Sequence, residues 1–324
     1  MVASPKKPSK ISRPVKRLQT KKEIEWIELP VFIHGMNPSK YPGTGEKEYR
    51  QLLGRVNNAL KLSDKCGFSK ESIFITWGRP TPQSEQSDQY LAEVERKIDS
   101  RVKKSMGNAY AGPFGLYGVA RDILFFGISD VSYYLSADGE QALRSHIFNY
   151  IGQEISKLDK SADHYFSLTI FGHSAGSIIA HDMLYHLFNN KNYTRSQEVN
   201  TFTEMEKLRQ MIDNGRLRIR HLYTFGSPIS TVMLRSDSLI HKFRANKLIQ
   251  PEDIGLGEEK NLSNPRWVNF WSRYDLASYP VSFFYSNPTG VIKDIEIHSS
   301  LSPEKAHLGY WTSGEMADHI AKTF

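Results

Sequence analysis

Short apolar runs alternate with longer amphipathic stretches along most of this chain. Six runs are nearly continuous in apolar residues and end at a glycine or a polar turn, as buried parallel strands do: residues 30–33, 72–77, 165–171, 222–225, 267–271 and 291–297. Five stretches carry apolar residues at helical spacing, namely 47–62, 89–104, 139–158, 177–188 and 315–322. This alternation predicts an α/β fold with a mostly parallel central sheet flanked by helices.

Two segments interrupt the alternation. An insertion near 107–136, rich in glycine and aromatic residues from 111 to 135, lies between the second and third expected strands. It would either wall an acyl pocket, with Phe114 and Tyr117 as substrate-binding candidates, or add a packed layer of loop and short helix. A polar segment at 189–216 follows the expected helix at 177–188, where it would form a lid or a surface helical hairpin.

Charge is concentrated in the first 22 residues. They carry eight Lys and Arg residues and no acid, so the remainder of the +7 chain has a net charge of about −1. Prolines and a scarcity of large apolar residues predict a disordered arm over 1–22 and a single domain over 23–324. The alternatives for the arm are an organelle-targeting segment and a tether for peripheral contact with anionic membrane. The near-neutral body argues against a nucleic-acid partner.

Hydropathy and cysteine content narrow the class of protein further. The sequence has no run of 18 apolar residues that would span a bilayer, and no secretory signal core is visible. The single cysteine, Cys66, excludes an intrachain disulfide and a multi-cysteine zinc site. We therefore expect a cytoplasmic enzyme, with organelle import through the basic arm as the alternative.

The most informative motif is Gly172-His173-Ser174-Ala175-Gly176, which lies between an expected strand and an expected helix. A Gly-x-Ser-x-Gly sequence on such a corner holds the serine hydroxyl out at the edge of the sheet, and small neighbours permit the tight turn. A glycine-rich helix start capped by Ser174 is the structural alternative. We take Ser174 as the candidate nucleophile.

A serine hydroxyl needs a histidine to accept its proton and a carboxylate to orient that histidine. Asp275 follows the expected strand at 267–271, at the end of the sheet where ligands gather, and His307 lies between the last strand and the last helix. His298 ranks second as the base, because it lies too close to the strand end to reach over the sheet. The resulting chain order is Ser174, Asp275, His307.

The oxyanion formed in acyl transfer needs two waiting donors. The backbone N–H of Ala175, directly after the candidate nucleophile, is the first. The loop after the first expected strand, His34-Gly35-Met36, offers the N–H of Met36 as the second. His34 is interpreted as a hydrogen-bonding residue of this loop on the substrate side and not as a second base.

These motifs resemble the α/β-hydrolase superfamily, in its lipase and esterase branch, from about residue 27 to residue 322. Residues 171–177 look like a lipase-type nucleophile turn, while Tyr223-Thr224-Phe225-Gly226-Ser227-Pro228 and His307-Leu308-Gly309-Tyr310-Trp311 are similar to segments of class 3 lipases. The resemblance implies a Ser-His-Asp mechanism through an acyl-enzyme, with no cofactor and no metal. The chain departs from it in having a single Gly176 after Ala175, followed by Ser177, and in the insertion at 107–136.

The sequence is compatible with three functions. The first is a serine carboxylester hydrolase acting on a small-molecule or lipid ester. The second is a thioesterase or amidase that uses the same three residues. The third is a catalytically silent hydrolase fold that serves as a binding protein.

Overall fold

The computed structural model describes most of the expected domain. The described residues are 24–35, 44–63, 67–75, 77, 93–94, 96–98, 100–101, 104–105, 131–132, 134–136, 143–159, 164–189, 203–234, 237–245, 247–259, 262–298 and 300–324. The arm at 1–22, Met36, Phe114, Tyr117, most of the insertion at 107–136 and much of the expected helix at 89–104 lie outside them.

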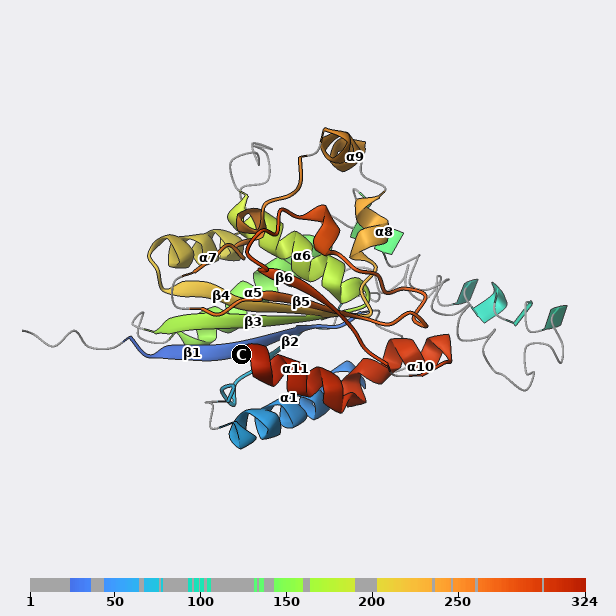
Figure 1. Cartoon of the computed structure of the whole chain (residues 1–324), viewed down its shortest axis with the longest axis horizontal. Helices are drawn as coiled ribbons and strands as arrows, with labels where there is room; N and C mark the ends of the chain where they lie inside the picture. Colours follow the sequence, from blue (N-terminus) through green and yellow to red (C-terminus); the bar gives the residue numbers. More distant parts are fainter. Residues whose placement is uncertain are drawn as a thin grey trace, which may run out of the picture.

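Strands and helices alternate in chain order (Figure 1). The strands are β1 (Trp26–Ile33), β2 (Ile73–Ile75), β3 (Tyr165–His173), β4 (Leu217–Phe225), β5 (Trp267–Trp271) and β6 (Ile292–Glu296). The α-helices are α1 (Thr44–Leu62), α5 (Ser145–Leu158), α6 (Ala175–Phe188), α7 (Thr203–Asp213), α8 (Ile229–Met233), α9 (Asp237–Arg244), α10 (Pro303–Leu308) and α11 (Gly314–Thr323). Short 3-10 turns are η4 (Pro251–Ile254), η5 (Ser282–Phe284) and η6 (Gly309–Thr312).

The six strands form one parallel sheet in the order β2-β1-β3-β4-β5-β6. From β1 the chain moves outward to β2, and it then returns past β1 to place β3 on the other side. The connections that leave β1 and β3 therefore diverge, and α/β sheets bind ligands in the crevice at such a switch point, outside the carboxyl ends of the strands. Gly35 follows β1 and Ser174 follows β3 at this point.

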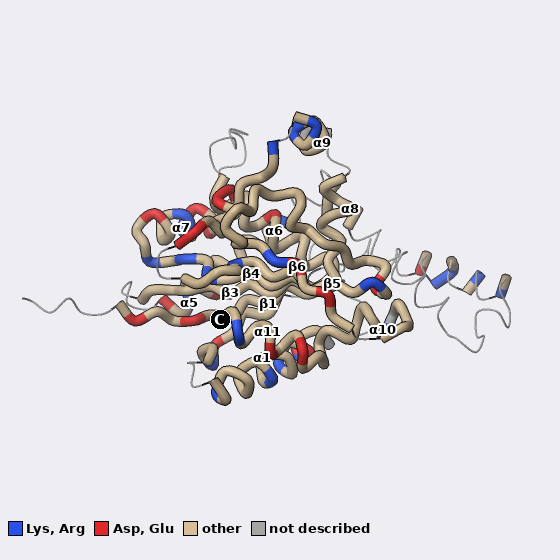
Figure 2. Tube along the Cα trace, viewed as in Figure 1, with Lys and Arg blue, Asp and Glu red and all other residues tan. Residues whose placement is uncertain are grey.

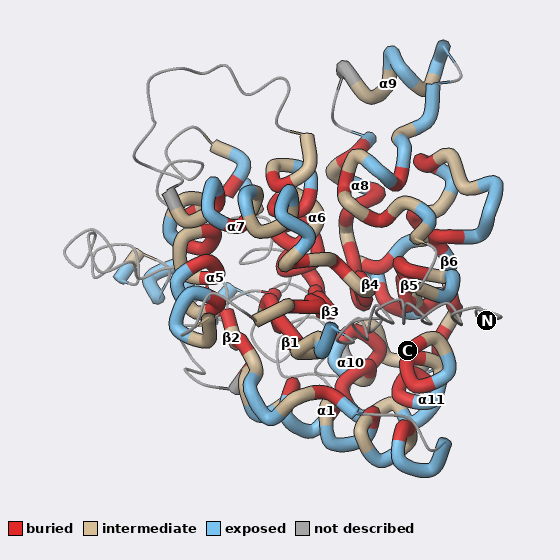
Figure 3. The backbone as a smooth tube through the Cα atoms, turned by 90° about the vertical axis from the view of Figure 1, so that its left-hand side faces the viewer, coloured by how far each residue is buried: buried red, intermediate tan, exposed pale blue. Residues whose placement is uncertain are grey.

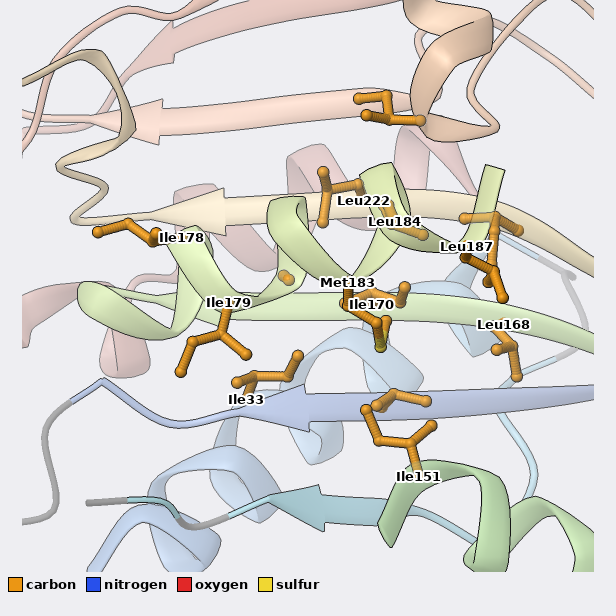
Figure 4. Packing of buried hydrophobic residues seen from close by; sticks show 14 of the residues in the cluster. Ile33, Ile151, Leu168, Ile170, Ile178, Ile179, Met183, Leu184, Leu187 and Leu222 are labelled. Carbon is orange, nitrogen blue, oxygen red and sulfur yellow. The ribbon is translucent and has the colours of Figure 1, made fainter. Parts of the chain in front are cut away.

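Two apolar layers cover the sheet. Alternate strand residues such as Val31 and Ile170 pack with α5 and α6 on one face, and the residues between them, such as Phe32 and Phe171, pack with α1 and α11 on the other. Figure 4 shows the first layer, in which Ile179 of α6 points toward Ile33 of β1. Buried positions line the interior on both sides of the strands, whereas α9 has none among the positions whose burial is described (Figure 3).

Aromatic rings form a ladder across five strands on the α1 and α11 face. The ring of Phe32 stacks on Phe74 at 5.2 Å and on Phe171 at 4.7 Å between centroids. Phe171 in turn stacks on Tyr223 at 5.2 Å, and Tyr223 lies 6.4 Å from Phe270. Offset aromatic pairs add roughly 0.5–1.5 kcal/mol each beyond their buried area, so the ladder helps to fix the register of neighbouring strands.

The structure confirms the predicted α/β class and corrects some boundaries. β4 begins at Leu217, five residues before the expected run at 222–225, because Arg218 and Arg220 hide its first half from an apolar pattern. The Nη1 atom of Arg220 lies 2.6 Å from Glu28 on β1, and the guanidinium of Arg218 lies over the ring of Trp26. These two cations are therefore strand residues with partners at the amino ends of the strands.

The segment at 189–216 contains α7, which packs against α5 and α6. Arg209 donates from Nη2 to the carbonyl oxygen of His186 at 2.8 Å. His186 lies twelve residues after Ser174 on α6, about 18 Å along the helix axis. The described part of the segment is thus a helix at the far end of α6, and residues 190–202 lie outside the described residues. No helix among the described residues is long and apolar enough to cross a membrane.

Candidate active site

Ser174 occupies a strained corner between β3 and α6. Its φ of 51° and ψ of −130° make it the one non-glycine residue with positive φ in the described part of the chain. Such a conformation costs of order 1–3 kcal/mol and persists only where the surroundings impose it. The backbone N–H of Ser174 donates to the carbonyl of Phe225 at the end of β4, at 3.0 Å. β3 and β4 thus hold the serine at the carboxyl edge of the sheet.

The end of β1 packs directly against this corner. A Cβ atom at Gly176 would lie 2.2 Å from the carbonyl oxygen of Ile33, so only glycine allows the first turn of α6 to approach β1 this closely. A Cβ atom at Gly35 would lie 2.8 Å from the Cβ of Ser174. The loop after β1 therefore abuts the serine, as an oxyanion-binding loop must.

Two further serines tie the corner to the loop after β4. The hydroxyl of Ser177 donates to the carbonyl of Ser174 at 2.5 Å and lies 2.7 Å from the hydroxyl of Ser227. The hydroxyl of Ser227 also accepts from the N–H of Ile229 at 3.3 Å, at the start of α8. This chain of bonds satisfies buried polar groups and fixes the turn geometry.

His307 and Asp275 form a buried pair at the same edge. The Nδ1 atom of His307 lies 3.0 Å from both carboxylate oxygens of Asp275, and both side chains are almost fully buried. His307 contacts Gly226, where an added Cβ would lie 3.1 Å from its Cε1 atom. With φ at 60°, Gly226 also has the left-handed conformation that favours glycine. A bond from Nδ1 to the carboxylate leaves Nε2 of His307 as the nitrogen able to accept a proton.

The carboxylate of Asp275 has further donors. The hydroxyl of Tyr310 donates to Oδ2 at 3.1 Å, and the N–H of Ala277 donates to Oδ1 at 3.0 Å. Burial raises the pKa of the Tyr310 hydroxyl, which keeps it a proton donor. These bonds hold the carboxylate plane so that it faces His307.

The side chain of His173 faces the candidate base, His307. Its Nε2 atom lies 3.1 Å from the carbonyl oxygen of His307, and its ring packs 4.8 Å from that of His307 and 4.7 Å from that of Trp311. Burial lowers the pKa of the His173 imidazole well below its ordinary value, and His307 and His34 lower it further. His173 is therefore neutral, with a proton on Nε2 to donate to the His307 carbonyl.

α6 begins at Ala175, and the backbone N–H groups of its first turn have no acceptor within the helix. The helix dipole adds positive potential at this end. The Ala175 N–H, predicted as one oxyanion donor, lies at this end of α6, directly after Ser174. Met36, the second expected donor, lies outside the described residues, although Gly35 just before it contacts Ser174.

The structure brings together four of the predicted site residues: Ser174, Ala175, Asp275 and His307. No hydrogen bond joins the Ser174 hydroxyl to His307, and such bonds often tighten only when substrate binds. The second-ranked base, His298, is exposed. It lies near Glu296 on β6, whose pKa is lowered chiefly by its hydrogen bond with Arg273 and further by His298. His34 lies at the end of β1, where its backbone carbonyl accepts from the indole of Trp77 at 2.5 Å.

No role was predicted for Ser177, Ser227 or Tyr310, although all three lie within the segments 171–177, 223–228 and 307–311 that resemble lipases. Their roles depend on contacts between segments 32 to 50 residues apart. In the described part of the chain, no group of three or more His, Cys, Asp or Glu residues is arranged to hold a metal ion.

Comparisons with known proteins add little to this geometry. No protein-family model matches the sequence, and no curated protein matches it. Among solved structures, a similar chain is the RedJ thioesterase from the prodiginine biosynthetic pathway in Streptomyces coelicolor. The two chains are 12% identical, with a TM-score of 0.36, and the alignment covers 96% of this chain and 91% of that one. The function proposed below therefore rests on the residues of this chain.

Proposed function

We propose that this protein is a serine hydrolase that cleaves carboxylic esters. One observation carries the proposal: a serine held at positive φ directly follows His173, whose ring packs against the buried, hydrogen-bonded His307–Asp275 pair at the switch point of a parallel sheet. Such strain at a chemically competent residue is a mark of functional sites. The order Ser174, Asp275, His307 also matches the order of the α/β-hydrolase triad.

The mechanism divides into acylation and deacylation. Ser174 Oγ attacks the ester carbonyl carbon while Nε2 of His307 takes the hydroxyl proton, and Asp275 stabilises the resulting imidazolium through Nδ1. The Ala175 N–H, with a second donor from the loop after Gly35, stabilises the oxyanion. The intermediate collapses as His307 gives its proton to the departing alcohol. Water then attacks the acyl-enzyme with His307 again as base, and Ser174 is regenerated.

A covalent probe and a mutant test this assignment. A fluorophosphonate should label wild-type protein at Ser174, and Ser174→Ala should remove both the label and hydrolysis of p-nitrophenyl butyrate, by ~10³-fold or more. Ser156→Ala on the surface of α5 is the matched control and should behave as wild type. Unlabelled wild-type protein with intact circular dichroism would identify a silent binding fold instead.

The same assay separates the ester, thioester and amide readings. Butyryl substrates with phenol, thiophenol and aniline leaving groups share one acyl chain and differ only in the scissile bond. We expect the oxygen ester to have the highest kcat/KM. A higher kcat/KM for the thioester or the anilide would overturn the ester assignment while leaving the three residues in their roles.

A further inference from the structure

A pocket of about 840 Å³ lies along the outer side of α6, separate from Ser174, Asp275 and His307. Its walls come from α6, α8, α9, residues 247–250 and Tyr134–Leu135. This volume lies within the range of small-molecule pockets, roughly 300–1,000 Å³. Positions from Ile178 to Asn189 on α6 line it, which gives a length of about 16 Å along the helix.

The deep part of this pocket is apolar. Ile178 of α6 and Ile229 and Met233 of α8 are nearly fully buried, and Val232 and Ile249 are partly buried beside them. Ile178 is one helical turn from Ser174, about 6 Å along the axis. The Ser174–Ser177–Ser227–Ile229 chain of bonds places the start of α8 against the same turn. The apolar end of the pocket therefore lies next to the candidate nucleophile.

The rim of the pocket is basic. Lys242 and Lys247 both line it and are exposed, and the N–H of Lys247 donates to the carbonyl of Lys242 at 2.8 Å, so their side chains start from adjacent backbone. Figure 2 shows basic positions on α9 above α6. Among the described residues, neither lysine forms an ion pair, so both ammonium groups remain available to a ligand.

The two acids in the lining offset this charge only in part, because Asp182 is paired with a cation and Asp253 alone keeps an uncompensated negative charge against the two lysines. Asp182 lies 2.6 Å from Arg144 and 3.3 Å from His186, and it accepts from Tyr134. Asp253 Oδ2 accepts from the backbone N–H of Gln250 at 3.4 Å. An apolar floor below two available cations suits a ligand with an apolar chain and a single anionic group.

We propose that this pocket binds a fatty carboxylate, with its alkyl chain along α6 and its carboxylate between Lys242 and Lys247. The choice of a carboxylate over other anions rests on the proposed function, because an ester hydrolase one helical turn away releases a carboxylic acid. The binding itself needs no reaction at Ser174.

The test is equilibrium binding to full-length Ser174→Ala protein, which cannot turn over a substrate. Titration calorimetry with dodecanoate, below its micelle concentration, should show one site, and dodecanol should bind about tenfold or more weakly because it lacks the anion. Lys242→Gln with Lys247→Gln should remove this preference and leave dodecanol binding unchanged. Lys61→Gln with Lys293→Gln, which removes two exposed cations elsewhere, should bind as the parent does.

A second variant tests the apolar floor. Val232→Trp should fill the deep part of the pocket and abolish binding of both ligands, with thermal unfolding used to confirm a folded chain. Absence of dodecanoate binding to the parent, or unchanged binding in the double lysine variant, would overturn the proposal. Because Ser174 is already replaced, neither outcome depends on whether the fluorophosphonate labels the wild-type protein. Fluorophosphonate labelling of the wild-type protein without dodecanoate binding would overturn only the proposal for the pocket and would leave the proposed hydrolase function in place.

Discussion

Two aspartates in this molecule have similar partners and different electrostatics. Asp275 and Asp182 each contact a histidine and accept from a tyrosine hydroxyl. Asp182 also pairs with Arg144 at 2.6 Å, whereas no arginine or lysine of the described chain pairs with Asp275. Asp182 is therefore neutralised permanently, and Asp275 is neutralised only when His307 takes a proton.

That difference distinguishes a structural network around Asp182 from the proposed catalytic network around Asp275. Burial raises the pKa of Asp182, but His186, Arg144 and Tyr134 together outweigh it and leave the pKa lowered. The ion pair of Arg144 and Asp182 joins the residue that precedes α5 to the middle of α6. Asp275 has no such fixed cation, so in the proposed mechanism its carboxylate stabilises the imidazolium that His307 becomes during proton transfer. Each aspartate can be tested by the same kinds of substitution.

The largest effect is expected from Asp275→Asn. The amide keeps the shape of the side chain but cannot stabilise an imidazolium, so kcat for p-nitrophenyl butyrate should fall by ~10³–10⁴-fold. The melting temperature should change little. Asp182→Asn, assayed in parallel, should retain kcat, and an equal loss of kcat in both variants would end the distinction.

Asp182→Ala is expected to act on stability. Removing the carboxylate leaves Arg144 without its partner, which should lower the free energy of unfolding by about 2 kcal/mol, discounted because the two side chains remain 13% and 19% exposed. Urea unfolding measures the loss. A variant as stable as wild type would show that the Arg144 pair contributes nothing net.

His181, beside Asp182 on α6, should make stability depend on pH. Burial lowers the pKa of its imidazole to about 4, so below pH ~6.5 the unfolded chain takes up a proton that the folded chain refuses. The contribution of neutral His181 to the free energy of unfolding is thus fully present above pH ~6.5, and it is lost as the pH falls toward 4. Between pH 7 and pH 5 the wild type should lose roughly 1–2 kcal/mol more than His181→Gln. Parallel pH curves for the two proteins would contradict the shift.

The smallest effects are expected from the two tyrosines. Tyr134→Phe and Tyr310→Phe each remove one hydrogen bond to an aspartate, worth about 1 kcal/mol of stability. Only Tyr310→Phe should also lower kcat, by up to about tenfold, because its bond holds the carboxylate that faces His307. Steady-state kinetics and urea unfolding on both variants give the comparison, and an equal kcat in the two would assign Tyr310 a structural role only.

The sequence predicted the parallel α/β sheet because the carboxyl halves of β1 and β4 and nearly all of β3 and β5 are buried and read as apolar runs. The first half of β4 was missed because it contains Arg218 and Arg220. At the amino edge of the sheet, Arg220 pairs with Glu28 of β1, and Arg218 lies over the ring of Trp26. Single apolar runs do not reveal such partners.

The sequence placed Ser174, Asp275 and His307 after strands. In the structure His307 bonds Asp275 and packs against His173, the neighbour of Ser174, and the catalytic roles of the three stay predictions. The contacts around them were not predictable. The bond from His173 to the His307 carbonyl spans 134 residues, and the bond from Tyr310 to Asp275 depends on how α10 and η6 turn. His307 itself lies in the last turn of α10, a helix that the apolar pattern did not predict.

Ser174 and His307 belong to different packing layers. Ser174 directly precedes α6, which is part of the layer with α5. His307 precedes Tyr310 and Trp311, which pack with α1 and α11 on the opposite face. Regions of a protein can open locally below the global unfolding transition. Release of the α10 and α11 segment alone would carry the base away while the serine stays in place. Proton-transfer competence would then be lost before the chain unfolds, so heat inactivation would precede loss of the sheet.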